Sequence, residues 1–201
     1  MIRADLHIHT TYSDDSTVTP KALVEKLVAH KSVKAVAVTD HDTVNGLEET
    51  RRLAAAYPDI LIIPGVEIST PQGDILILGA EETPPKPWTV QNVVDFARTN
   101  NYVSVVAHPY REYGMGDAAR NYKFDAIEVL NGESTPQANK QAHELAKTMK
   151  LPGTAGSDAH KPSEPLTVYT EVQAGLNVDE ILKAIKKGLV TAHSAARSIH
   201  F

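Results

Sequence analysis

The sequence predicts an α/β protein whose strands form a parallel sheet. Short apolar segments rich in Val, Ile and Leu alternate along the chain with helical patterns. About seven such pairs can be counted, and alternation of this kind is typical of βα units. A doubly wound sheet and a closed barrel both fit it. No glycine-rich phosphate-binding pattern follows the first expected strand, so the nucleotide-binding form of the doubly wound fold lacks support.

The first expected strand lies close to the N-terminus and carries two histidines. Side chains alternate between the faces of a strand, so Asp5, His7 and His9 are expected on one face and Leu6 and Ile8 on the other. A strand aims both imidazoles at one point, as a metal ion requires; an exposed polar face is the alternative. Further strands are expected over residues 35–39, 60–64, 75–78, 103–107, 126–130 and 189–192, with a weaker candidate at 152–156.

Helices are expected where apolar residues recur at helical spacing. Thr19 is the expected N-cap of the first helix, with Pro20 at its first position. Gly188 is the expected C-cap of the last helix. No linker, repeat or low-complexity stretch divides the chain, so residues 1–201 are expected to form one domain. The expected helices cover residues 20–30, 89–101, 136–150 and 178–188.

Composition narrows the class of protein. The chain has 201 residues, a net charge of −5 and no cysteine. Disulfides and thiolate metal sites are therefore excluded, and a cytoplasmic location is expected. No apolar run reaches the length of a membrane span, and no signal-peptide pattern is evident. The sequence contains no run of Lys or Arg, so stable binding to duplex nucleic acid is not expected. The end of a nucleic-acid chain is still compatible with the sequence as a substrate.

Histidine and acidic side chains recur where the expected strands end. In a parallel α/β barrel the C-terminal ends of the strands meet at one rim, where active-site residues lie. Imidazole and carboxylate ligands without thiolate suit Zn²⁺, Mn²⁺, Fe or Mg²⁺. The candidate ligands outnumber the positions around one tetrahedral ion, so a cluster of ions is expected. Such clusters bind the oxygens of a phosphoryl group. The side chains are His7, His9, Asp40, His41, Asp42, Glu67, His108, Asp158 and His160.

These stretches resemble the motifs of the polymerase and histidinol phosphatase (PHP) family of metal-dependent phosphoesterases. The matching stretches occur in the family's order and read "DLHIHTTYSDDS", "VTDHDT", "PGVEIS", "AHP" and "GSDAH". The resemblance implies a distorted (β/α)7 TIM-like barrel. It also implies hydrolysis of phosphate esters by a metal-bound hydroxide at a cluster of two or three divalent ions, whether Zn, Mn, Fe or Mg. The implied substrate is a small phosphomonoester, a nucleotide, a small phosphodiester or an oligonucleotide end.

The resemblance also assigns ligands. His7 and His9 would bind one ion with Glu67 and Asp158; Asp14, His41 and His160 would bind a second, bridged by Glu67; and His108 would belong to a third. It gives catalytic roles to His41, Asp158 and His160. Two departures from the family pattern matter. "SDD" replaces the usual Ser-Asp-Gly, so the ligand is Asp14 or Asp15, with Asp14 favoured. Asp74 stands where the third site usually has a histidine, which favours a harder ion or weakens that site.

Several polar residues outside the ligand set have two interpretations each. Arg111 would hold a substrate phosphate or pair with an acid. Asn131 would contact substrate at the rim or form a turn. His193 would line the rim and contact substrate, or lie away from the rim. Asp40 and Asp42 would orient an imidazole or cap the next helix. His30, His143 and His200 also lie outside every motif, and the first two are expected on solvated helix faces.

Two other functions compete with phosphate-ester hydrolysis. A metal-dependent amidohydrolase or deaminase also has an early His-x-His, but it calls for a mid-chain lysine and an isolated late aspartate. Here the corresponding positions hold Glu67 and an Asp-x-His pair, Asp158 and His160. A non-catalytic, metal-stabilised PHP-like domain would have lost several ligands, whereas only the Asp74 position deviates.

Overall fold

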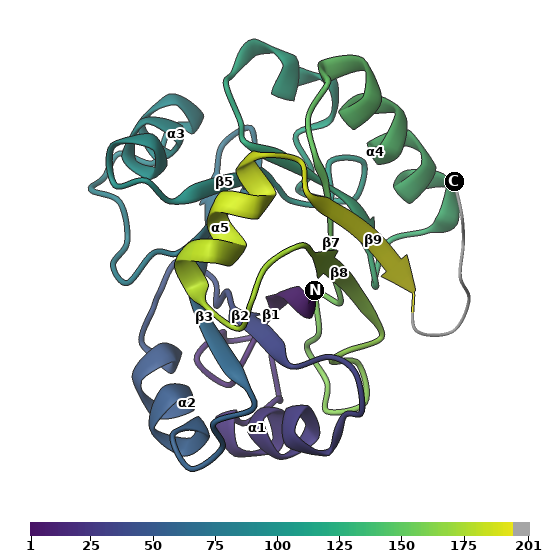
Figure 1. Cartoon of the computed structure of the whole chain (residues 1–201). Coiled ribbons are helices and arrows are strands. Elements are labelled where there is room, and N and C mark those ends of the chain that lie inside the picture. The colour runs from purple at the N-terminus through teal and green to yellow at the C-terminus, as the bar shows by residue number, and fades with distance from the viewer. Residues whose placement is uncertain (195–201) are drawn as a thin grey trace.

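The computed structural model describes residues 1–194, and a curled sheet dominates it (Figure 1). Within these residues the sheet has nine strands in the order β7-β6-β5-β4-β3-β2-β1-β8-β9. It forms a nearly closed barrel, which confirms the expected distorted TIM-like barrel with more strands than the seven expected. The strands are β1 (Ile2–Ile8), β2 (Ala35–Val38), β3 (Leu61–Thr70), β4 (Gly73–Leu78), β5 (Val103–Val106), β6 (Ala126–Asn131), β7 (Gly153–Gly156), β8 (Val168–Val172) and β9 (Val190–Ser194).

The sheet is mixed rather than wholly parallel. Strands β1, β2 and β3 are parallel, as are β5, β6 and β7, but β4 pairs antiparallel with both β3 and β5. The expected βα alternation is wrong here because only Pro71 and Gln72 separate β3 from β4, too few for a crossover. Strand β8, which the sequence pattern missed, is antiparallel to β1 and β9.

Helices cover the outside of the sheet and one of its openings. They are α1 (Pro20–Ala29), α2 (Gly46–Ala54), α3 (Val90–Thr99), α4 (Pro136–Met149) and α5 (Val178–Lys186), with a 3₁₀ helix η1 (Gly116–Asn121). Thr19 caps α1 by accepting from the Ala22 amide, as expected. The C-cap of α5 is Lys187, and Gly188, the expected C-cap, follows it with φ +70°. Helix α2 was not expected, because its nine residues include four charged ones.

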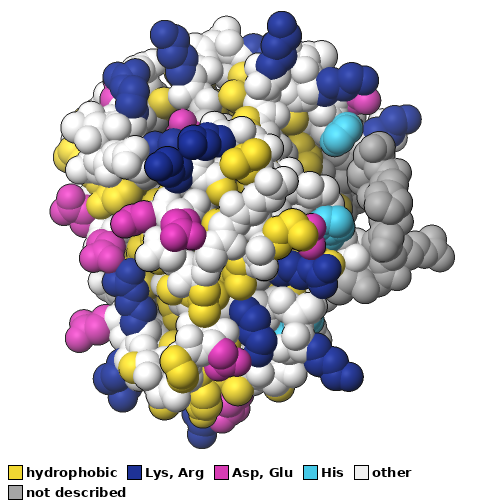
Figure 2. Space-filling view, in the orientation of Figure 1, with side chains coloured by type: hydrophobic (Ala, Val, Ile, Leu, Met, Phe, Trp, Pro, Cys, Tyr) yellow, Lys and Arg dark blue, Asp and Glu magenta, His cyan; other side chains and the backbone are white. Residues whose placement is uncertain are grey.

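Helix α5 fills one end of the barrel. Its Ile181 and Ile185 side chains are fully buried and pack in one cluster with Leu6 of β1 and Leu78 of β4. Figure 1 shows α5 lying across the barrel in the foreground, and Figure 2 shows Lys, Arg, Asp and Glu side chains interspersed on the same face. The apolar plug leaves the opposite end for polar side chains.

A register irregularity in β1 changes the expected alternation of its side chains. The pairing with β2 shifts between Asp5 and Ile8, as at a β-bulge. Leu6 therefore packs in the cluster of α5, whereas Ile8 packs in a different cluster with Leu23 of α1. The expectation that Leu6 and Ile8 share one face is wrong for this reason. The two histidines still converge on one site.

The barrel closes where the chain beyond β7 meets β1. The Asp158 amide donates to the His7 carbonyl oxygen at 2.7 Å, and the His9 amide donates to the Ala159 carbonyl oxygen at 3.1 Å. These bonds fix the backbone of the first histidine motif against the backbone of the last motif. None of the helices within residues 1–194 is long and apolar enough to cross a membrane.

The close approach of the chain where the barrel closes leaves no room for a side chain at Gly156. A Cβ there would lie 2.2 Å from the His7 Cβ and 2.7 Å from the His7 nitrogen, so backbone would have to move. We expect Gly156→Ala to lower the free energy of unfolding by about 3 kcal/mol, at the upper end of overpacking effects. Urea unfolding of both proteins measures the difference.

Gly175→Ala is the matched control, because its nearest neighbour would be the tip of the exposed Glu180 side chain. Its expected change is within about 0.5 kcal/mol. Equal stabilities of the two variants would contradict the close approach of β7 to β1.

Candidate metal centre

The structure brings the expected ligands together at the barrel end opposite α5. They come from β1, from β3 and β4, and from the segments that follow β2, β5 and β7. Ligand atoms within each group lie within 4.8 Å of one another. The three groups are His7, His9, Glu67 and Asp158; His9, His41 and His160; and Glu67, Asp74 and His108.

The first group is almost fully buried. The Nε2 atoms of His7 and His9 lie 3.0 and 3.1 Å from Glu67 Oε2, and 3.3 and 3.2 Å from Asp158 Oδ1. All of these residues are buried. Two imidazoles and two carboxylates converge on one volume from three strands, which is a donor set that a divalent cation accepts.

Neighbouring acceptors fix the orientation of the His7 ring. Its Nδ1 lies 3.0 Å from Oε1 of Glu128, which is buried in β6. An ionised carboxylate only accepts hydrogen bonds, so Nδ1 carries a proton and Nε2 is the nitrogen available to a metal ion. Glu128 was not among the expected site residues, although a carboxylate within the apolar run "AIEVL" was a visible signal.

A different chain of hydrogen bonds orients His9. The Ser13 hydroxyl donates to Asp40 Oδ1 at 2.9 Å, so its oxygen is free to accept from His9 Nδ1 at 3.2 Å. Asp40 also accepts from the amide and hydroxyl of Thr10. His9 Nδ1 is therefore the donor to Ser13, and Nε2 is the nitrogen that faces a metal ion or an added proton. Asp40 thus helps to orient the His9 imidazole, although only indirectly, through Ser13. Asp42 instead accepts a hydrogen bond from the Ser69 amide.

These tautomers test whether a cation fits. The Nε2 atoms of His7 and His9 lie only 3.0 Å apart. Two lone pairs at that distance repel each other unless a proton or a metal ion lies between them and the carboxylates. His108 Nδ1 is likewise buried without a hydrogen-bond partner in residues 1–194. The donor set thus fits divalent metal ions.

The second group corrects one expected ligand. Asp15, rather than Asp14, reaches the histidines: its Oδ2 lies 3.6 Å from His41 Nε2 and 3.4 Å from His160 Nε2. The turn closed by the Ser16 amide and the Ser13 carbonyl exposes both aspartates, and only the second faces the site. The rings of His41 and His160 stack on His9, with centroids 4.3 and 4.2 Å away.

Glu67 connects the first and third groups. Its Oε2 faces His7 and His9, while its Oε1 lies 3.0 Å from His108 Nε2. The carboxylate of Asp74, at the start of β4, completes the third group. One carboxylate with an oxygen on each side is the geometry of a bridging ligand.

Charge interactions oppose burial throughout the centre. Burial by itself would lower the pKa of His7, but Asp158, Glu67 and Glu128 hold that pKa well above its usual value. Burial also disfavours ionised Glu67, yet the surrounding histidines keep its pKa well below the usual range. Burial and the Glu67 charge raise the pKa of Asp74 to about 7. Protons and metal ions therefore compete for the same atoms.

The expected substrate contacts fall in three different places. Arg111 lines the pocket above the centre, and its Nη1 donates to Asp158 Oδ2. Asn131 is buried and donates to Asp158 Oδ2 at 3.1 Å and Glu128 Oε2 at 3.0 Å, so it orients carboxylates instead of facing the pocket. Oδ1 of Asp158 remains directed at the histidines.

His193 lies away from the centre. It is in the edge strand β9, where its ring stacks on Tyr169 at a centroid distance of 5.4 Å. It lines a separate cavity of about 360 Å³ beside α4, so the expectation that it lines the metal-side rim is wrong. His30 accepts from backbone amides at the end of α1, and His200 lies outside the described residues.

The centre opens into a pocket of about 580 Å³. This volume is within the range of roughly 300–1,000 Å³ that small-molecule sites occupy. Lining residues include Asp15, His41, Glu67, Asp74, His108, Arg111, Asp158 and His160.

Comparisons with known proteins agree with this geometry. A family model described as PHP-associated matches residues 136–190. An uncharacterised protein of Methanocaldococcus jannaschii is 30% identical over 142 residues, which are 65% of this chain and 82% of the relative. A two-domain protein from Bacteroides vulgatus, described as containing a predicted PHP-like metal-dependent phosphoesterase, superimposes with a TM-score of 0.80 at 20% identity, over 96% of this chain and 64% of that one. The chain belongs to the PHP family.

A further match covers a shorter stretch. The 5′-3′ exoribonuclease Rnm of Escherichia coli is 45% identical over 67 residues, which are 33% of this chain. Those residues are only 22% of the exoribonuclease, so this chain spans a small part of that protein. PHP membership and the three ligand groups together identify a centre that is able to hold metal ions.

The shared position of Glu67 predicts a graded loss of metal. Because Glu67 belongs to two groups, Glu67→Gln should remove at least one divalent ion per chain, from an expected content on the order of two or three. Asp74→Ala should affect only the third group. Elemental analysis of reconstituted proteins measures the content. Glu81→Gln, at an exposed ion pair with Arg51, is the control, and wild-type content in Glu67→Gln would contradict the bridging role.

Because Glu128 orients the His7 ring without being a ligand itself, we expect it to affect the affinity of the centre for metal. Glu128→Gln keeps the volume but can place an NH₂ donor against His7 Nδ1, which moves the ring proton to Nε2. We expect an affinity loss of about 10- to 100-fold, measured by competition with a chromophoric chelator. The exposed Glu133→Gln should bind as wild type. Unchanged affinity in Glu128→Gln would show that the tautomer is set by another contact.

Proposed function

We propose that this chain is a metal-dependent hydrolase of phosphate esters that acts at the candidate metal centre. The observation that carries the proposal is the overlap of three ligand groups, which share His9 and Glu67, beneath a pocket that also contains Arg111. When bound, divalent ions supply positive charge to phosphoryl oxygens and lower the pKa of the attacking water. Zn, Mn, Fe and Mg all suit the nitrogen and oxygen donors.

The chain's own residues supply positioning and charge. Arg111 is partly exposed and donates one nitrogen to Asp158, which leaves other guanidinium N–H groups for a phosphate oxygen. His41 and His160 are partly exposed beside Asp15, and whichever of them does not hold an ion can give a proton to the leaving oxygen. Buried Glu128, Asn131 and Ser13 hold the ligand orientations fixed.

The proposed substrate is a small phosphorylated compound or the end of a nucleotide chain. The pocket volume supports a small ligand, and the exoribonuclease similarity supports a nucleic-acid end. A stable duplex complex is not proposed, because the net charge of −5 disfavours a polyanion. We also propose that residues 1–201 act as one catalytic domain in the cytoplasm.

Asp158→Asn tests the proposal directly. Asparagine is similar in size but neutral, so it binds a cation poorly and cannot balance its charge. Activity on a panel of phosphate esters should depend on added divalent metal in the wild type, and should fall by at least about 100-fold in the variant. Circular dichroism should show an unchanged fold.

The matched control is His30→Ala, whose side chain lies at the end of α1 and outside the pocket. It should turn over substrate at the wild-type rate. Near-full activity of Asp158→Asn with metal bound would reject its role as a ligand. Opening of a cyclic amide without hydrolysis of any phosphate ester would favour the amidohydrolase alternative.

A further inference from the structure

An aromatic side chain stands exposed at the mouth of the metal pocket. Tyr113 lines this pocket and is 74% exposed. Among the large apolar side chains of residues 1–194, only that of Met1, at the N-terminus, is more exposed. A single exposed ring needs no explanation elsewhere on a surface, but this one borders the proposed site of reaction and contributes nothing to the core.

The backbone holds Tyr113 in a fixed and costly conformation. Its φ is +62°, in the left-handed region that glycine and asparagine adopt at lower cost than tyrosine. Its carbonyl oxygen accepts from the Asp74 amide at 3.0 Å, which joins the loop to the start of β4. A Cβ on the next residue, Gly114, would lie 2.5 Å from the carbonyl oxygens of His108 and Pro109. The loop is therefore tightly folded and presents the ring from a defined position.

The groups around Tyr113 divide the pocket into two parts. Arg111, two residues earlier, borders the metal ligands, and the Cα atoms of the two residues lie within about 7 Å because of chain geometry. The hairpin between β3 and β4 adds polar lining residues, Ser69, Thr70 and Gln72. One part of the pocket thus suits a phosphate, and the other offers an aromatic face with hydrogen-bonding groups beside it.

We propose that Tyr113 is a stacking platform for the base of a nucleotide substrate. This inference rests on the proposed function and specifies its substrate class as a mononucleotide or the terminal nucleotide of an oligonucleotide. The phosphate lies at the metal centre and Arg111, the sugar spans the gap, and the base stacks on the ring. Stacking accepts any base, because every base has a π-face. The polar hairpin residues face the sugar hydroxyls and the edge of the base.

A pair of ligands that differ only in the base tests the platform. The probes are methylene phosphonate analogues of adenosine 5′-monophosphate and ribose 5-phosphate, whose ester oxygen is replaced by CH₂ so that neither is hydrolysed. Calorimetry on the metal-loaded full chain should show that the wild type binds the adenosine analogue about tenfold more tightly. Tyr113→Ala should bring this ratio close to one, and Tyr113→Phe should keep it.

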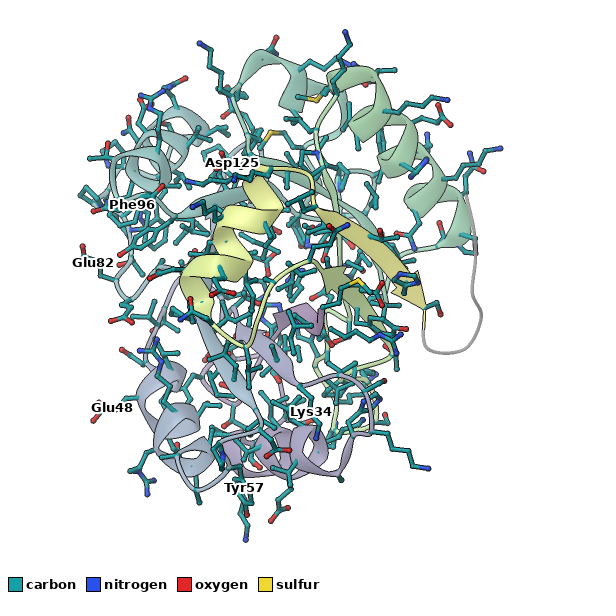
Figure 3. All side chains as sticks on the ribbon, in the orientation of Figure 1. Lys34, Glu48, Tyr57, Glu82, Phe96 and Asp125 are labelled. Atoms are coloured by element: carbon teal, nitrogen blue, oxygen red, sulfur yellow. The ribbon has the colours of Figure 1, made fainter. Side chains whose placement is uncertain are left out.

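Alanine has the same left-handed backbone strain as other L-residues, so Tyr113→Ala removes the ring with little change in backbone cost. Tyr57→Ala is the control, because Figure 3 shows Tyr57 at the outer edge of the molecule beside α2, and its affinity ratio should equal that of the wild type. A wild-type ratio near one, or a ratio unchanged in Tyr113→Ala, would overturn the platform.

Turnover of the hydrolysable parent compounds separates this inference from the function on which it rests. Absence of hydrolysis with every divalent metal, combined with a base preference that depends on Tyr113, would refute the proposed function and retain the platform. Efficient hydrolysis of both compounds, without a base preference in binding, would retain the function and refute the platform.

Discussion

The carboxylate of Glu67 is the constraint on which the rest of the site depends. A buried carboxylate is tolerated only when partners compensate its lost hydration. Here His7, His9 and His108 surround both of its oxygens at 3.0–3.1 Å. These histidines come from β1 and from the segments that follow β1 and β5, so β1, β3 and β5 must come together before the charge is compensated. Without metal, protons on the imidazoles provide this compensation, which explains why the pKa of His9 rises to about 9 despite its burial.

The antiparallel hairpin of β3 and β4 has a direct effect on the chemistry. Because the chain reverses at Pro71 and Gln72, Ser69 pairs with Asp74, and β4 starts at the metal end of the barrel. Asp74 therefore returns to within reach of the same Glu67 that β3 supplies. A helical crossover would have started β4 at the α5 end and left the third group without its carboxylate. The departure from a wholly parallel sheet is thus what allows a third ligand group.

The parts of this site that the sequence predicts are those set by local geometry. His7 and His9 are separated by one residue, and strand periodicity alone aims both at one point. Asp14 and Asp15 could not be distinguished in this way, because a turn has no fixed periodicity and its tip decides which carboxylate faces inward. Glu128 was missed because a lone acid in an apolar strand usually faces solvent; only the position of His7 across the barrel makes it an acceptor. The β-bulge between Asp5 and Ile8 likewise depends on pairing with β2.

The bonds that close the barrel also determine when the site can exist. His7 belongs to the first strand, and Asp158 follows the seventh, yet their backbones are joined and their side chains share a ligand group. During synthesis the histidine motif leaves the ribosome long before its carboxylate partner, so metal ions meet an incomplete set of ligands. Contacts between such distant segments form late in folding. Metal loading is therefore coupled to the last step of barrel closure, and the early histidines remain exposed to non-native partners until that step.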